Sequence, residues 1–184
     1  MGAILGLISG YYGSWPDLLI SRVLDVLFAF PAILLAIAIM AVLGQNLFNV
    51  MIAIGIVNVP IFARVIRASA MSVRTQTFIE ASEAVGASSW QIIIRHLFPN
   101  CLPSLIIQMT VAFAWAVIAE AALSFLGIGT RPPTPSWGLI LNEGRNVMEY
   151  APWQPVFSGF AIMVTVFSLN VLGDGLRDAL SPEG

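Results

Sequence analysis

Long apolar stretches dominate the hydrophobic pattern of this chain. Five of them stand out, at residues 1–12, 26–44, 47–63, 101–119 and 156–173. A helix needs about 20 residues to cross a bilayer, so the last four stretches predict transmembrane helices, whereas the first is too short. The apolar residues do not alternate with period two, which argues against transmembrane β-strands. The pattern therefore predicts an all-α, polytopic transmembrane helical bundle with four full spans and one partial span.

The arginines indicate how these helices are oriented. If the spans alternate in direction, six of the eight arginines fall on one side of the membrane: Arg22, Arg64, Arg67, Arg74, Arg95 and Arg177. By the positive-inside rule that side is the cytoplasm. Residues 75–100 then form a cytoplasmic loop, and residues 130–155 form an external loop. Residues 1–12 become the end of a helix that arrives at the cytoplasm, so we expect residues 1–184 to be one membrane domain that is incomplete at its N-terminus.

The composition supports a membrane protein and excludes several kinds of site. Hydrophobic residues make up 58% of the chain and charged residues 10%, whereas a soluble domain carries about 25% charged residues. All eight basic residues are arginine, so the chain has no Walker A lysine for ATP and no lysine for a Schiff base. One histidine and one cysteine exclude a four-ligand zinc site and an internal disulfide. The net charge of −2 gives no support for nucleic-acid binding.

The cytoplasmic loop begins with a predicted short helix. Thr77 stands three residues before Glu80, which is the spacing of a capping box, and Gly86 follows an apolar-periodic run. We therefore predict a helix over residues 78–85, which Gly86 ends in a left-handed conformation. Glu80 and Glu83 are then exposed at the tip of the loop.

A second short helix is predicted directly after the first. Ser88 stands three residues before Gln91, which is a second capping box. Pro99 and Pro103 are expected to break or kink the chain as it enters the next span. The loop is then a helix–turn–helix, either an ordered connector or a docking surface, and the two capping boxes favour docking. Apolar residues at helical spacing give the second helix one predicted buried face, which consists of Trp90, Ile93, Ile94, Leu97 and Phe98.

Residues 80–86 read Glu-Ala-Ser-Glu-Ala-Val-Gly, and Pro99 follows them. This run resembles the EAA loop of bacterial ABC-importer permeases, in which Glu-Ala-Ala precedes three residues, a glycine, and a stretch that ends in Ile-x-Leu-Pro. The chain departs from that pattern at Ser82, His96 and Phe98, which leaves the helix and the turn possible. The resemblance implies that the loop couples the permease to an ATPase through Glu80, Ala81, Ser82, Glu83, Ala84, Gly86 and Pro99.

Three further segments, at residues 119–127, 132–138 and 170–178, look like the dipeptide, oligopeptide and nickel branch of that family. The similarity thus runs the whole length of the chain, although the first span and the start of the second are missing. It implies the ABC type I importer permease fold and a multi-pass location in the bacterial cytoplasmic (inner) membrane. The implied function is a translocation path for peptides that works by alternating access, with nickel or glutathione as alternative substrates.

The resemblance also implies partners. These are a second permease subunit, two ATP-binding subunits that hold ATP and Mg, an external substrate-binding protein and the lipid bilayer. The chain itself should catalyse no reaction and bind no cofactor or metal. Two other classes compete, a passive channel and an intramembrane protease. A channel needs no ATPase-docking element, and a protease would need an aspartate pair, whereas Asp174 lies in Leu-Gly-Asp-Gly without the Gly-x-Gly-Asp pattern of that class.

Few charged residues fall within or beside the apolar stretches. Glu120 interrupts an apolar run, which is costly unless the side chain faces a cavity or a partner. It lies either on the substrate path, where it could attract a peptide amino terminus, or in a structural place, and we favour the structural role. That place would be a hydrogen bond to a neighbouring helix or a position near the external interface that water reaches. Asp25 stands three residues after Arg22, a spacing that predicts a local ion pair.

The external segment around Pro133, Pro135 and Trp137 is stiff and carries an aromatic tip. Proline limits the conformational entropy that such a loop loses when it docks. We therefore predict that these three residues contact the external substrate-binding protein. The alternative is that Trp137 anchors the loop at the membrane interface, where tryptophan is enriched.

Overall fold

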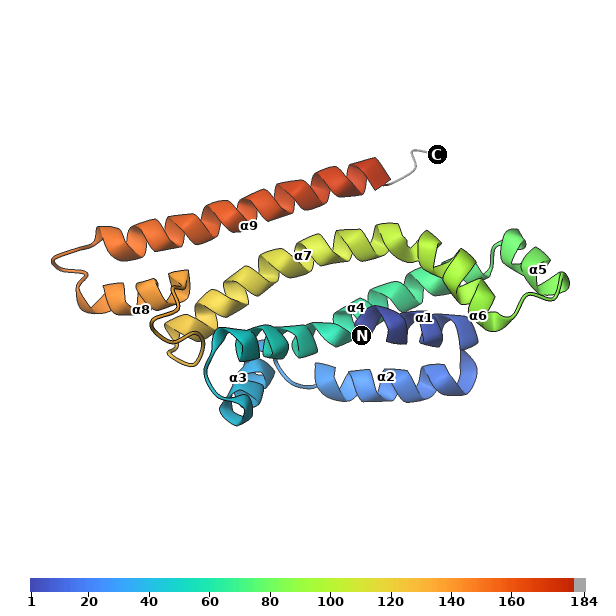
Figure 1. The fold of residues 1–184 in the computed structure, drawn as a ribbon, viewed down its shortest axis with the longest axis horizontal. Coiled ribbons are helices and arrows are strands. Elements are labelled where there is room, and N and C mark those ends of the chain that lie inside the picture. The colour runs from blue at the N-terminus through green and yellow to red at the C-terminus, as the bar shows by residue number, and fades with distance from the viewer. Residues whose placement is uncertain (181–184) are drawn as a thin grey trace. The chain divides into compact units, whose positions relative to one another are not determined.

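The structure, a computed structural model, describes residues 1–180 as helices joined by short connections (Figure 1). No strand occurs in this part of the chain, so the predicted all-α fold is confirmed. The last four residues of the predicted domain 1–184 lie outside the described residues. The elements are α1 (Gly2–Tyr12), α2 (Ser14–Phe28), α3 (Ala32–Leu43), α4 (Leu47–Arg74), α5 (Thr77–Ala84), α6 (Ser89–Ile92), the π-helix η1 (Ile93–Leu97), α7 (Phe98–Phe125), α8 (Trp137–Asn146) and α9 (Trp153–Leu180).

Within residues 1–180, three helices are long and apolar enough to cross a membrane. They are α4, the helix Ser89–Phe125 that α6, η1 and α7 form together, and α9. The helices predicted at residues 47–63, 101–119 and 156–173 are therefore confirmed. Helix α1 has 11 residues, so it is too short to span a bilayer, as the sequence predicts.

The prediction of a single helix over residues 26–44 is wrong. Helix α2 ends at Phe28, Pro31 caps the start of α3, and the two helices form a bent pair that counts at most as one broken span. Proline disfavours helical conformation in the residue before it, but it is well suited to a helix start. Because the apolar composition continues across this break, the hydrophobic pattern alone did not reveal it.

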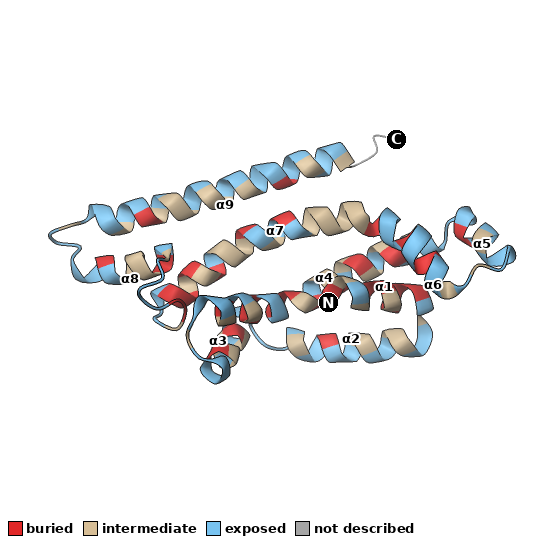
Figure 2. Cartoon of the chain, in the orientation of Figure 1, coloured by how far each residue is buried: buried red, intermediate tan, exposed pale blue. Residues whose placement is uncertain are grey.

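Two compact units make up the chain. The first comprises Met1–Ala29, Asn58–Met109 and Leu176–Gly184, and the second comprises Phe30–Val57 and Thr110–Gly175. Each unit has its own apolar core, and its buried residues are drawn in red in Figure 2.

The core of the first unit joins α1, α4 and the predicted cytoplasmic loop. Helix α1 approaches α4 closely at every fourth residue, because glycines face α4 there. A Cβ atom added to Gly6 would lie 2.5 Å from the carbonyl oxygen of Ala63, and Gly2 and Gly10 are equally close to α4. Small residues at this spacing let two helix backbones pack directly together. The core consists of Leu7, Tyr11, Ile66, Ala70, Ile79, Ile92, Ile93, Leu97 and Cys101.

The core of the second unit is built from α3, the first half of α4 and the second half of α7. Helix α8 packs on α7 through Gly138, where an added Cβ atom would lie 2.2 Å from the carbonyl oxygen of Ala121. Gly173 of α9 lies against Thr110 of α7. A Cβ atom added to Gly173 would lie 2.6 Å from the Thr110 hydroxyl oxygen. The core residues are Ala36, Met40, Val50, Ala53, Ile54, Val57, Ala119 and Leu123.

Candidate functional site

The first helix of the predicted cytoplasmic loop, α5, forms without the predicted cap. Thr77 is the first helical residue, Gln76 occupies the N-cap position, and no side chain caps the helix start. The predicted capping box between Thr77 and Glu80 is therefore wrong, although the helix itself lies within one residue of its predicted bounds. Its attachment comes from Ile79 instead, which is 1% exposed and belongs to the core of the first unit.

Gly86 ends α5 in the predicted left-handed conformation, with φ at +86°. The amide of Gly86 donates to the carbonyl of Glu83 (2.9 Å), and the amide of Ala87 donates to the carbonyl of Ser82 (3.1 Å). These two bonds make a Schellman motif, which satisfies the carbonyls at the helix end. An added Cβ atom at Gly86 would meet nothing within 4 Å. The requirement for glycine is thus conformational rather than steric.

The second capping box is confirmed. The backbone amide of Gln91 donates to the Ser88 hydroxyl (3.4 Å), and the backbone amide of Ser88 donates to the Gln91 side-chain oxygen (3.0 Å). Ser88 lies two residues after Gly86, so the chain turns sharply and enters α6 with a fixed direction. The turn between the two helices is therefore defined by hydrogen bonds on both sides.

The buried face predicted for the second helix is partly wrong. Ile93 and Leu97 are buried, but Trp90 is 67% exposed, and Ile94 and Phe98 are exposed as well. Ile92 of α6 and Cys101 of α7 belong to the core instead, and the π-helix η1 between them changes the helical register.

The two prolines do not break the chain. Pro99 lies in the first turn of α7, directly after η1, and Pro103 lies inside α7, which continues to Phe125. The predicted break is therefore wrong, because the loop leads into α7 as one continuous helix, Ser89–Phe125. The π-helix η1 lies directly before Pro99 in that helix.

The residues of the EAA motif lie together on the outside of this loop. Glu80, Ala81, Glu83, Ala84, Gly86 and Pro99 are exposed, and Ser82 is half-buried. The Ser82 hydroxyl donates to the carbonyl of Phe78 (2.7 Å) within α5. Exposed apolar side chains flank the motif at Phe78, Val85 and Trp90. The loop thus presents a mixed apolar and acidic surface on helices whose other side is fixed in the core.

A pocket of about 410 Å³ opens beside the loop within the first unit. Glu80 and Glu83 line it from α5, and Arg74 lines it from the end of α4. Residues from α1 and α2 complete the wall, among them Ser9 and Asp17. The loop and the helices α1 and α2 thus share one pocket, and the hydrophobic pattern did not predict that Ser9 and Asp17 would lie beside the loop.

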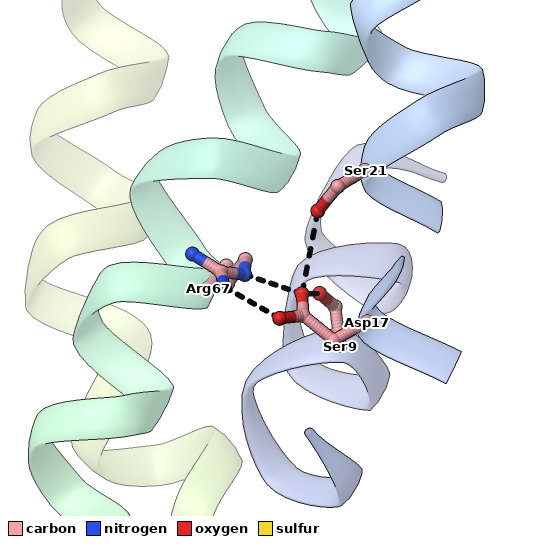
Figure 3. A network of polar contacts seen from close by, with 4 residues as sticks. All are labelled: Ser9, Asp17, Ser21 and Arg67. Carbon is pink, nitrogen blue, oxygen red and sulfur yellow. Dashed lines mark hydrogen bonds and ion pairs between the residues drawn. The ribbon is translucent and has the colours of Figure 1, made fainter. Parts of the chain in front are cut away.

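A polar network ties α1, α2 and α4 together in this unit (Figure 3). Asp17 of α2 accepts two hydrogen bonds from the Arg67 guanidinium of α4, each 2.5 Å long. The hydroxyl of Ser9 in α1 also donates to Asp17, and Ser21 donates from one turn further along α2 (3.3 Å). Sequence analysis missed this network, because the residues that it joins are up to 50 positions apart.

The local ion pair predicted between Asp25 and Arg22 is wrong. Asp25 instead pairs with Arg64 of α4, at 3.6 Å. The Arg64 guanidinium also lies over the ring of Phe28, 4.3 Å from its centroid. Helix-to-helix contacts thus take precedence over the i, i+3 spacing in α2.

Glu120 is held by hydroxyl groups in the second unit. Its Oε1 atom accepts from Ser124 (2.7 Å), Thr130 (3.0 Å) and Ser136 (2.8 Å). The Ser124 hydroxyl accepts in turn from the backbone amide of Thr130 (3.0 Å). The carboxylate therefore fastens residues 130–136 to α7. These bonds are structural, but they go to a loop and to α7 itself rather than to a neighbouring helix.

The predicted external loop contains a helix that the apolar pattern did not predict. Ser136 caps α8 by accepting from the backbone amide of Gly138 (3.2 Å), and Trp137 is the first helical residue. The side chains of Pro133, Pro135 and Trp137 are exposed. Within residues 1–180, no group of three or more His, Cys, Asp or Glu side chains could hold a metal ion.

Comparisons with known proteins agree with this geometry. Residues 2–183 match the model of the family described as "Binding-protein-dependent transport system inner membrane component". The chain is 51% identical, over 182 residues, to the dipeptide transport system permease protein DppC of Alkalihalophilus pseudofirmus, covering 99% of this chain and 60% of that protein. It is 50% identical, over 173 residues, to the glutathione transport system permease protein GsiD of Escherichia coli O157:H7, covering 94% of this chain and 57% of that protein.

The fold is also found in a solved transporter. A chain of the MetNI methionine ABC transporter, in an inward-facing conformation, superposes with a TM-score of 0.73 at 20% sequence identity. The match covers 98% of this chain and 88% of the other. The chain spans about three fifths of the length of the curated relatives that it matches.

Proposed function

Because the chain belongs to the family of binding-protein-dependent transport system inner membrane components, we propose that it is the permease subunit of an ATP-driven importer. The predicted resemblance to ABC-importer permeases is confirmed by the family match and by the two kinds of permease relative. The predicted type I importer fold and the inner-membrane location are confirmed as well. In this role the chain forms the translocation path by alternating access and performs no covalent chemistry.

Peptides are the proposed substrate class. The dipeptide and glutathione permeases that the chain resembles are named for small molecules built on peptide bonds, and both share about half of its residues. Glutathione itself is the second candidate, because that resemblance covers 94% of the chain. Nickel remains the other alternative.

The proposed coupling surface is the one formed by the EAA residues. Two ATP-binding subunits would hydrolyse ATP with Mg, and the loop would transmit their movement to the membrane helices. What supports this proposal is one structural arrangement: the exposed motif sits on α5, whose inner side is anchored by Ile79 in the same core as α1 and α4. A displacement of such a loop must move the helices behind it, because packed interiors deform little.

Two further partners are proposed, an external substrate-binding protein and a second permease subunit. We propose that Pro133, Pro135 and Trp137 contact an external substrate-binding protein, since all three are exposed on a segment that α7 holds in place. A second permease subunit would complete the path within the bilayer. Glu120 remains a proposed residue of that path, with the structural role described above as the alternative.

Glu120 can be tested with a pair of substrates. If it attracts a peptide amino terminus, Glu120→Gln slows uptake of a free dipeptide but leaves uptake of its N-acetylated form unchanged. If its role is structural, both substrates are affected equally or not at all.

The orientation has its own test. In a Cys101→Ser background, cysteine introduced by Asn142→Cys should react with a membrane-impermeant thiol reagent on intact cells, and cysteine introduced by Ser82→Cys should not. The opposite labelling pattern would overturn the assignment of residues 75–100 to the cytoplasm.

ATP-dependent uptake tests the function itself. The assembled transporter, reconstituted in vesicles with its binding protein, should accumulate a labelled dipeptide only when ATP is supplied on the ATPase side. A passive channel would equilibrate the peptide without ATP, and that result would contradict the proposal.

A further inference from the structure

The Asp17–Arg67 pair is shorter and less exposed than the Asp25–Arg64 pair in the first unit. Both carboxylate oxygens accept from the guanidinium, which makes the pair bidentate (Figure 3). The two side chains are 20% and 34% exposed, whereas those of the neighbouring pair Asp25–Arg64 are 56% and 65% exposed. A bidentate pair fixes both distance and orientation, and burial reduces the screening by water.

The arginine of this pair stands at the edge of the core that carries the coupling loop. Ile66, its direct neighbour on α4, and Ala70, one turn further, are both buried in that core. Ile79 of α5 and Ile92 of α6 belong to the same cluster. Through these apolar contacts α4 is bound to the loop, so a shift of the loop is passed to the turn of α4 from which Arg67 extends.

Helix α2, by contrast, has little apolar attachment of its own. Among its residues only Leu24 is buried, while Leu18, Leu19, Val23 and Val26 are all more than half exposed. Its links to α4 are polar, at Asp17 and at Asp25 with Phe28. Helix α2 also packs against α1, but the side-chain contacts that link it directly to α4 are these charged ones.

We propose that Asp17 and Arg67 are the positioning residues that make α2 move with α4 when the coupling loop moves. The inference rests on the proposed function of the loop. Sliding α2 along α4 would leave a partly buried guanidinium and carboxylate without partners, which costs the equivalent of about tenfold or more in an equilibrium. The pair therefore keeps α2 in register through the transport cycle. Ser9 links α1 to the same pair of helices, because its hydroxyl also donates to Asp17.

The test compares two matched asparagine variants in the assembled transporter. Asp17→Asn removes the charge from the bidentate pair, and Asp25→Asn does the same at the exposed pair on the same two helices. The readout is the number of peptides taken up per ATP hydrolysed in reconstituted vesicles. We expect this ratio to fall about tenfold in Asp17→Asn and to stay within about twofold of wild type in Asp25→Asn. The exchanged variant Asp17→Arg/Arg67→Asp should recover much of the loss.

Other outcomes decide against the inference. A merely structural pair would lower the melting temperature or the yield of Asp17→Asn but leave the ratio per assembled complex unchanged, and that result would overturn it. If Asp17→Asn fails to assemble, Arg67→Lys replaces it, because lysine keeps the charge but loses the bidentate fork; an unchanged ratio there also overturns the inference. If the wild-type transporter itself takes up no peptide with ATP, the proposed function fails instead, so the two failures are distinguishable.

Discussion

Two carboxylates in apolar helices, one in each unit, are satisfied in opposite ways. Asp17 faces a guanidinium that contributes two hydrogen bonds of 2.5 Å and a full positive charge. Glu120 faces three hydroxyl groups, and the structure pairs it with no cation among residues 1–180. The first contact joins three helices, whereas the second holds a loop on one helix.

The difference shows what each region needs from its charged residue. A charge pair between helices is lost when either partner becomes neutral, because the other charge is left without compensation. A ring of hydroxyl donors needs only an acceptor oxygen, and an amide can provide one. The region behind the proposed coupling loop therefore depends on charge, and the region around residues 130–136 depends on hydrogen-bond geometry.

The largest difference is expected when each carboxylate is replaced by its amide. Asp17→Asn should lower the free energy of unfolding by about 2 kcal/mol, since it leaves the Arg67 guanidinium without a compensating charge in a partly buried place. Glu120→Gln should cost less than about 1 kcal/mol, because the amide oxygen still accepts from the hydroxyls. Denaturant unfolding of the purified protein in detergent, followed by tryptophan fluorescence, measures both. Equal losses would show that the comparison is wrong.

A second substitution at Glu120 removes the acceptor as well as the charge. Glu120→Ala leaves the Thr130 and Ser136 hydroxyls without their shared partner, which should cost about 1.5 kcal/mol. The loss should be local, so amide hydrogen exchange should quicken in residues 130–138 and stay unchanged in α5 and α6. Faster exchange throughout the chain would mean that Glu120 stabilises more than the external loop.

A smaller effect is expected at the two helix starts of the coupling loop. Ser88→Ala removes the observed capping box and should cost about 1 kcal/mol. Thr77→Ala is the matched control, because its side chain caps nothing, and it should change stability by less than about 0.5 kcal/mol. If Thr77→Ala lowered stability more than Ser88→Ala, the capping box that the sequence predicts at Thr77 would be present after all.

Local features of this fold could be predicted from the sequence. The apolar helices, the capping box at Ser88 and the left-handed Gly86 each depend on residues within a few positions of one another. The same local signals failed where burial decided the outcome. Helix α5 begins at Thr77 without a cap because Ile79 fixes it in the core, and Trp90 and Ile94 are exposed where the π-helix η1 changes the helical register.

Long-range features could not be predicted in the same way. Asp17 and Arg67 are 50 positions apart, and the packing of α1, which precedes α2, against α4 helps to bring their helices together. A signal for that packing was present, since glycine recurs at every fourth position at Gly2, Gly6 and Gly10. Pro31 likewise marked the break between α2 and α3. The partners of Glu120 lay 10 and 16 residues away in a loop, and no periodicity connects a loop to a helix.

The central claim is that the turn of the coupling loop passes the ATPase movement to the membrane helices. Gly86→Val tests it most directly, because a β-branched residue at φ +86° costs on the order of 1–2 kcal/mol and misdirects α6. Gly86→Asn is the matched control: asparagine tolerates this conformation, and the space around Gly86 is open.

The measurement is substrate-stimulated ATP hydrolysis in reconstituted vesicles, normalised to the amount of assembled complex. Gly86→Val should lose the stimulation and release the ATP-binding subunits on gentle purification, while Gly86→Asn should keep both. If Gly86→Val retains ATPase binding and full stimulation, this loop is not the coupling element.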